Sequence, residues 1–143
     1  MSLTLRFVHV LAAVVWLGGM LFIALVLVPV VRSVEPPALR TRLVQEIGLR
    51  FRALAWITLA LLLASGLGNL WLRPYLLELP RFHLKLTLVV IALTLAALHD
   101  FVLGPRAGRP GALPSARVRA SWIARVNVLL VTGIVILGLA LRG

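Results

Sequence analysis

A few side chains could do chemistry, and most of them lie inside apolar runs. The nitrogen-bearing ones are His9, His83, Lys85 and His99. The sequence uses arginine fourteen times but lysine only once. A buried lysine can lose its proton and act as a ligand or base, which arginine cannot do. Lys85 could equally extend its ammonium group to a membrane surface, and each histidine could be a hydrogen-bonded packing residue.

Helical geometry groups these residues. At about 100° per residue, Lys85 and His99 fall within roughly 40° of each other on one helix face, about 21 Å apart. Ala92 and Ala96 lie between them on that face and would leave room for a flat ligand. His83 points nearly the opposite way from Lys85, so the two residues are not expected to serve one pocket.

The first apolar run carries a comparable stripe, formed by His9, Ala13, Trp16 and Met20. Neutral imidazole is a standard axial ligand of haem iron, and bundle cofactors sit between helices on inward-facing side chains of this kind. A second group of polar residues is expected near the other membrane face, and there His99 could hold a second haem. The members of this group are His99, Asp100, Arg125 and Asn127.

Other interpretations account for some of these residues without a cofactor. The small residues Gly18, Gly19, Ala60, Ala64 and Gly68 are typical of closely packed membrane helices. Asp100 and Arg125 could form a buried ion pair. Copper is a further alternative, although Cu(I) favours cysteine and methionine and Met20 is the only internal methionine.

Composition predicts the elements that must position these side chains. Of 143 residues, 62% are hydrophobic and only 13% are charged, which is far from the composition of a soluble domain. Each of four apolar runs is long enough to cross a bilayer as a helix. We therefore predict an all-α, integral membrane four-helix bundle, a single domain over residues 1–143 with spans at about 5–31, 53–72, 82–103 and 122–141.

The connections between the spans contain prolines and glycines that break helices. Residues 38–52 place apolar side chains on one face, which predicts an interfacial amphipathic helix before the second span. Connections 32–52 and 104–121 together hold nine arginines, against four in the N-terminus, the 73–81 connection and the C-terminus. The positive-inside rule then predicts a multi-pass protein of the cell (inner) membrane, with both termini outside and these two loops cytoplasmic.

Several function classes are excluded or disfavoured. The net charge of +11 belongs to residues that flank membrane spans, so it indicates anchoring in the lipid bilayer and no nucleic-acid partner. The absence of cysteine excludes disulfides, thiolate metal sites and thiol catalysis. No nucleophile–base–acid set or phosphate loop is present, which argues against a hydrolase.

Three stretches resemble known membrane families. The run from Phe7 to Gly19, with Pro29 and Arg32 after it, resembles the first helix of CopD-type (copper resistance D) membrane domains. The run Phe82–His83–Leu84–Lys85 and the closing Arg125–Val126–Asn127 resemble HemJ, the membrane protoporphyrinogen oxidase. In HemJ-like proteins a first-helix histidine and a third-helix lysine are regarded as haem b ligands, and they match His9 and Lys85. Val128 follows Asn127 here, where that family has an acidic residue.

Three functional hypotheses follow. The first is a haem b protein with a redox role, which would transfer electrons or oxidise a porphyrinogen as a haem-dependent oxidoreductase. Its metal ligands would be drawn from His9, Lys85 and His99, while His83, Arg125 and Asn127 would contribute to cofactor binding. The second is a CopD-like module that binds or transports copper, and the third is a cofactor-free structural subunit. The sequence leaves open the redox partner or porphyrin substrate, and is compatible with a homo-oligomer.

Overall fold

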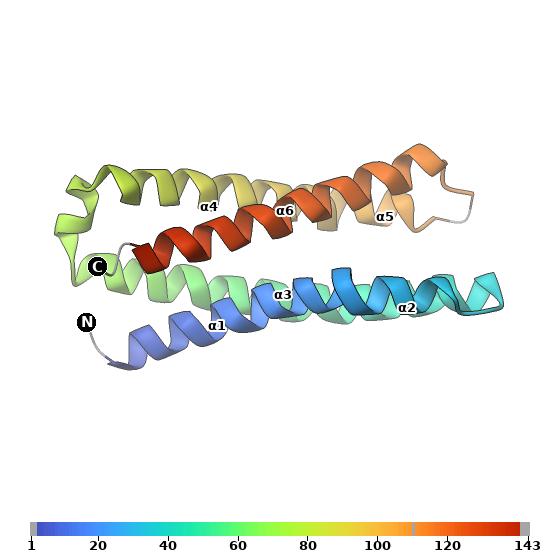
Figure 1. The fold of residues 1–143 in the computed structure, drawn as a ribbon, viewed down its shortest axis with the longest axis horizontal. Helices are drawn as coiled ribbons and strands as arrows, with labels where there is room; N and C mark the ends of the chain where they lie inside the picture. Colours follow the sequence, from blue (N-terminus) through green and yellow to red (C-terminus); the bar gives the residue numbers. More distant parts are fainter. Residues whose placement is uncertain (1–2, 110, 141–143) are drawn as a thin grey trace. The chain divides into compact units, whose positions relative to one another are not determined.

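The computed structural model describes residues 3–109 and 111–140, and almost all of them are helical (Figure 1). In chain order the elements are α1 (Leu3–Phe22), η1 (Ile23–Leu27), α2 (Val28–Arg32), α3 (Pro37–Trp71), η2 (Pro74–Glu78), α4 (Pro80–Leu98), η3 (His99–Leu103), α5 (Gly104–Ala107) and α6 (Pro114–Ala140). The segments η1 and η3 are π-helical, and η2 is a 3-10 helix.

Within residues 3–109 and 111–140, four continuous helical stretches are long and apolar enough to cross a membrane. They are Leu3–Arg32, Pro37–Trp71, Pro80–Ala107 and Pro114–Ala140. Together they confirm the predicted all-α fold with four membrane helices. Over the described residues these stretches overlap the four predicted spans, and each begins before the span predicted for it.

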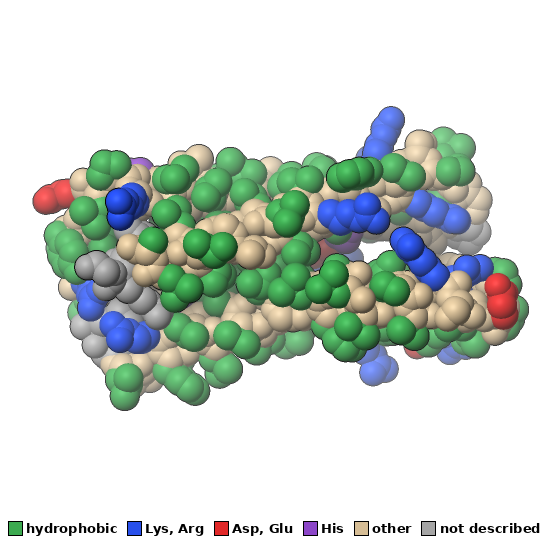
Figure 2. Space-filling model, in the orientation of Figure 1, with side chains coloured by type: hydrophobic (Ala, Val, Ile, Leu, Met, Phe, Trp, Pro, Cys, Tyr) green, Lys and Arg blue, Asp and Glu red, His purple; other side chains and the backbone are tan. Residues whose placement is uncertain are grey.

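The chain divides into two compact units, Met1–Leu79 and Pro80–Gly143. In unit 1, α1 packs along α3, and in unit 2, α4 packs along α6 (Figure 1). Each unit is therefore a helical hairpin. Many large apolar side chains on these helices are exposed, including Leu67 at 67% and Leu129 at 73%, as expected for surfaces that face lipid (Figure 2).

Two glycines, Gly19 and Gly68, mark where α1 and α3 pack closely. A Cβ atom added to Gly68 would lie 3.4 Å from the side chain of Leu5, near the start of α1. Further along α1, Gly19 lies against the ring of Phe51, with no room for a Cβ atom. These contacts confirm a close-packing role for Gly19 and Gly68. By contrast, a Cβ atom on Gly18 would meet nothing within 4 Å, and Ala60 and Ala64 are exposed.

Helix α3 differs from the sequence prediction. Residues 38–52 do not form a separate interfacial helix, because α3 runs without a break from Pro37 to Trp71. The predicted amphipathic segment is therefore the first part of the second membrane helix and shares its axis. On this part Arg42 Nε donates a 2.8 Å hydrogen bond to Glu46 Oε1, one turn later.

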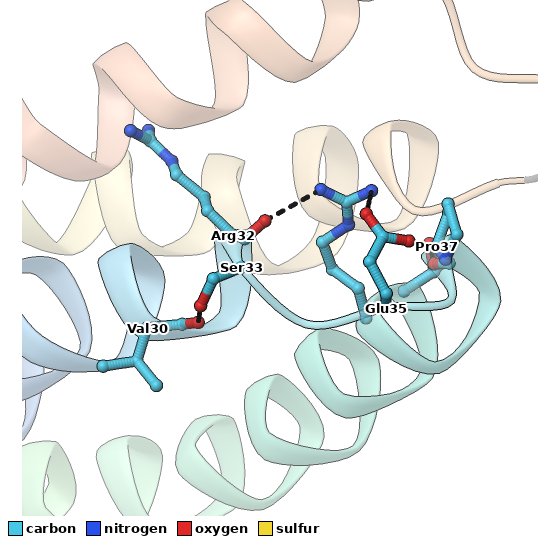
Figure 3. Close-up of polar contacts among 7 residues, drawn as sticks. Val30, Arg32, Ser33, Glu35 and Pro37 are labelled. Atoms are coloured by element: carbon cyan, nitrogen blue, oxygen red, sulfur yellow. Dashed lines mark hydrogen bonds and ion pairs between the residues drawn. The ribbon is translucent and has the colours of Figure 1, made fainter.

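The turn between α2 and α3 is held by polar contacts to the backbone (Figure 3). Arg40 Nη1 donates to the carbonyl oxygen of Arg32 at 3.1 Å, and its Nη2 lies 4.0 Å from Glu35 Oε1. Ser33 Oγ donates to the carbonyl oxygen of Val30 at 2.7 Å. The Arg40 guanidinium thereby satisfies the Arg32 carbonyl group at the end of α2, and the Ser33 hydroxyl adds to the backbone bond that Val30 O already accepts from Ser33 N.

The two π-helical segments share one cause. A proline follows each of them, Pro29 after η1 and Pro105 after η3. Proline lacks an N–H group, and its ring clashes with the carbonyl group four residues earlier, which here lies inside the π-helical segment. In η3, a Cβ atom added to Gly104 would lie 2.9 Å from the carbonyl oxygen of His99, so a glycine suits this close approach.

Candidate functional site

The first candidate ligand, His9, lies on α1 and is held by α3. Its Nδ1 atom is 2.8 Å from the hydroxyl oxygen of Ser65, which is 3% exposed. The Ser65 hydroxyl in turn donates to the carbonyl oxygen of Leu61 at 2.6 Å. A serine on a helix often donates to the carbonyl group four residues earlier in this way.

This arrangement favours one tautomer of His9. The Ser65 hydroxyl has one proton, which can be placed in the bond to Leu61. The Ser65 oxygen can then accept a hydrogen bond from His9, so we assign the proton of a neutral His9 ring to Nδ1. The lone pair is consequently on Nε2, which is the form in which a histidine binds a metal ion.

Small residues lie near the His9 ring on both helices of the hairpin. A Cβ atom added to Gly66 on α3 would lie 3.5 Å from His9 Cε1. Ala12, one turn after His9, is 3% exposed, and Trp16 is also buried. The predicted stripe of His9, Ala13, Trp16 and Met20 therefore avoids the exposed face of α1, because all four residues are buried or half-buried.

Unit 2 contains a similar arrangement around Lys85 on α4. A Cβ atom added to Gly138 on α6 would lie 3.4 Å from Lys85 Nζ, so the ammonium group lies directly over this glycine. Lys85 is half-buried, and Ala92, two turns later on its predicted face, is 1% exposed. The ammonium group thus lies along the partner helix of its own hairpin.

The two hairpins repeat one pattern at fixed sequence spacings. A shift of 76 residues relates Ile23–Leu27 to His99–Leu103, Pro29 to Pro105, and the buried Trp16 to the buried Ala92. The same shift relates His9 to Lys85. On the second helices the shift is 72 residues. It relates Gly66, which faces His9, to Gly138, which faces Lys85, and the buried Leu59 to the buried Val131.

This repeat gives Lys85 and His9 the same place in their hairpins. Each lies on the first helix, about 20 residues before the proline that follows the π-helical segment, and packs over a glycine of the second helix. Each hairpin therefore holds one nitrogen base at the equivalent position. The equivalence favours a functional role for Lys85 over a purely interfacial one.

The other predicted nitrogen residues differ in position. His83 is exposed on α4, consistent with its predicted direction away from Lys85. His99 begins η3, and its Nδ1 atom lies 3.0 Å from Asp100 Oδ1. Both His99 and Asp100 are half-buried, and no repeat equivalent shares their chemistry, since Ile23 and Ala24 occupy these places in unit 1.

The remaining residues of the predicted second polar group lie on α6. The alternative of an Asp100–Arg125 ion pair is wrong for the described residues: Asp100 pairs with His99, while the guanidinium of Arg125 lies 5.5 Å from the centre of the Trp122 ring. Asn127 is buried at 5% exposure, and its Oδ1 atom has no hydrogen-bond partner within the described part of the chain. Ala55 occupies the equivalent place in unit 1.

Sequence reasoning missed Ser65, Gly66 and Gly138, which contact the two nitrogen bases. A signal for them existed in the spacing, because Gly66 and Gly138 are separated by almost the same interval as His9 and Lys85. Ser65 is one of the few polar residues within the second charge-free run. Among the residues that the structure describes, no group of three or more His, Cys, Asp or Glu side chains could hold a metal ion.

Comparisons with known proteins bear on the family. An uncharacterized protein of Aquifex aeolicus (strain VF5) is 34% identical over 140 residues, which is 95% of this chain and 92% of that protein. No solved structure matches the chain. Residues 45–141 match the family described as copper resistance protein D, and this region contains Lys85 but not His9. The chain therefore belongs to the CopD family of multi-pass membrane proteins.

Proposed function

We propose that this CopD-family protein binds haem b through His9 Nε2 and serves a redox role in the membrane. The observation that carries the proposal is the chain of contacts from His9 through Ser65 to Leu61. A metal-bound histidine usually donates its other N–H group to a fixed acceptor, which orients the ring and sets its tautomer. Ser65 is such an acceptor.

The donor set of the chain fits a haem better than a copper ion held by protein side chains alone. The porphyrin supplies four nitrogen ligands, so the protein needs to provide only one or two axial ligands. Within the described residues no cluster of three or more His, Cys, Asp or Glu side chains is present. The small residues Ala12 and Gly66 beside His9 support a flat ligand against this helix pair.

The protein's own groups would have distinct parts. A bound haem would supply one-electron chemistry, suited to electron transfer or porphyrinogen oxidation. Ser65 would keep the His9 ring in place and Nε2 unprotonated. Arg6, exposed one turn before His9, offers a guanidinium for a propionate group. Lys85 is proposed as a nitrogen ligand of unit 2, because the repeat gives it the place in its own hairpin that His9 has in unit 1.

Copper binding is the second candidate, and the family match favours it. In this case His9 Nε2 would bind copper, since imidazole is a suitable copper ligand. Met20 lies eleven residues after His9 on α1, about 16 Å along the helix axis, so it is not expected to bind the same ion.

One preparation tests both candidates. The full chain is expressed with haem supply and purified in detergent, and its absorption spectrum is recorded before and after dithionite reduction. Iron and copper are then quantified in the same sample. We expect a Soret band, with sharper bands on reduction, that His9→Ala removes and Lys85→Ala weakens. His83→Ala is the matched control, because His83 is an exposed histidine two residues from Lys85.

The outcomes separate the candidates. Copper without a Soret band, lost in His9→Ala, would support the copper function and reject the haem function. A colourless protein that retains neither metal would reject both. A Soret band that survives His9→Ala would reject the assignment of His9 as the ligand.

A further inference from the structure

In unit 1, the apolar run of the first helical stretch and the apolar run of α3 are offset from each other along the hairpin. At one end the helices are level, because Leu5 near the start of α1 packs on Gly68 near the end of α3. Further along, Gly19 lies against Phe51, the residue between Arg50 and Arg52. The apolar run of α1 continues beyond this point to Val31, beside the arginine-bearing part of α3.

Both helical stretches of unit 1 are longer than the hydrocarbon core of a bilayer. The stretch Leu3–Arg32 is about 45 Å long and α3 is about 52 Å long, whereas the hydrocarbon core measures about 30 Å. If the core begins at the level end, its roughly 20 residues finish near Phe22 on α1 and Arg52 on α3. The segments η1 and α2 and the start of α3 then extend into the headgroup layer.

This projecting end, defined as residues 23–52, combines two kinds of surface. Its exposed apolar side chains include Leu25 at 71%, Val30 at 59% and Leu49 at 57%. It also carries five arginines but only two acidic residues, Glu35 and Glu46. The arginines are Arg32, Arg40, Arg42, Arg50 and Arg52. In Figure 2, blue side chains gather near the end of the hairpin where α2 lies.

We propose that the projecting end of unit 1 binds the headgroups of anionic phospholipids. Apolar and cationic side chains at one level of a helix pair match the boundary between acyl chains and phosphates. Guanidinium groups bind phosphate oxygens in a bidentate manner. Arg40 is committed to the turn, where it contacts Arg32 O and Glu35, whereas the guanidinium of Arg32 points away from these contacts (Figure 3). Arg32 and Arg50 are both exposed and are the proposed headgroup ligands.

The test uses the detergent-purified full chain, titrated with dioctanoyl-phosphatidylglycerol and followed by native mass spectrometry. Dioctanoyl-phosphatidylcholine and glycerol phosphate are parallel probes for a neutral headgroup and a free phosphate. The double variant Arg32→Gln/Arg50→Gln is compared with Arg73→Gln/Arg81→Gln, which removes the same charge from two arginines outside residues 23–52. Thermal unfolding in detergent without lipid checks that each variant is folded.

We expect the parent to bind phosphatidylglycerol more tightly than either probe. Neutralising Arg32 and Arg50 should weaken this binding by about fivefold per arginine, with little change in the Arg73/Arg81 pair. Equal losses in both pairs, or equal affinity for phosphatidylcholine, would overturn the proposal. Equal affinity for glycerol phosphate would assign the site to free phosphate and would also overturn it. If the glutamine pair does not fold, Arg32→Lys/Arg50→Lys replaces it. That variant keeps the charge but loses bidentate geometry, and unchanged affinity in it would count against guanidinium binding.

Discussion

His9 and Ser65 are separated by 56 residues in the sequence, yet His9 Nδ1 lies 2.8 Å from Ser65 Oγ. The contact joins the two helices of unit 1 at a point where Ser65 is 3% exposed. When the serine proton is used within α3, the histidine donates from Nδ1 and Nε2 carries the lone pair. This packing contact between two helices is the basis of the proposal that His9 binds a metal.

Replacement of Ser65 by alanine should weaken metal retention without removing the ligand. The ring of His9 loses the acceptor that sets its orientation and tautomer, and loss of such a partner typically costs about 10–100-fold in metal affinity. Titration of the apoprotein with haem, followed at the Soret band, measures the change. Thr58→Ala is the matched control, because Thr58 is also buried but its hydroxyl donates to Ala55 O in its own helix. An equal loss in both variants would show that Ser65 acts only through stability.

Gly19→Ala should destabilise unit 1 by about 1–3 kcal/mol, because the added methyl group has no space beside the ring of Phe51. Gly18→Ala is the control, since a Cβ atom there meets nothing within 4 Å. That change should be neutral or stabilise the helix by up to about 1 kcal/mol. Denaturant unfolding in detergent compares the two. Phe51→Leu should restore part of the stability of Gly19→Ala, and failure of that rescue would argue against the contact.

The sequence predicts the membrane helices well, because twenty or more consecutive apolar residues have few other stable conformations in this composition. The prediction of a separate interfacial helix at residues 38–52 is wrong for a physical reason. Amphipathic periodicity shows which face of a helix is apolar, but it does not show whether the helix bends at the membrane surface. No proline or glycine pair interrupts α3 at Arg52, so the helix continues.

The candidate site was predictable only in part. His9 and Lys85 could be identified because ionisable residues are rare in membrane spans. Their neighbours on the second helices depend on the packing register, which the apolar pattern alone does not determine. Ser65 and Gly138 therefore appear only when α3 and α6 are placed against α1 and α4. The two π-helical segments likewise require the backbone, although Pro29 and Pro105 are visible in the sequence.

Gly66 should tolerate a methyl group but not a large side chain. An added Cβ atom lies 3.5 Å from His9 Cε1, which is ordinary contact, whereas the branches of a leucine would displace the ring. We expect Gly66→Ala to keep the Soret band and Gly66→Leu to lose most of it. Gly48→Leu is the control on the same helix, since nothing lies within 4 Å of a Cβ atom there. An unchanged spectrum in Gly66→Leu would place the metal ligand elsewhere.

Asn127→Ala should leave the stability of the protein unchanged or raise it by up to about 1 kcal/mol. The Asn127 amide is buried, and its Oδ1 atom has no partner within the described residues, so its removal costs no hydrogen bond at that atom. The repeat supplies the replacement, because Ala55 occupies the same place in unit 1. The reciprocal change, Ala55→Asn, should destabilise by about 1–3 kcal/mol, since it buries an amide in a place built for a methyl group. Thermal unfolding of both variants without metal tests the pair. A marked loss of stability in Asn127→Ala would mean that the amide has a stabilising partner and that the two positions are not equivalent.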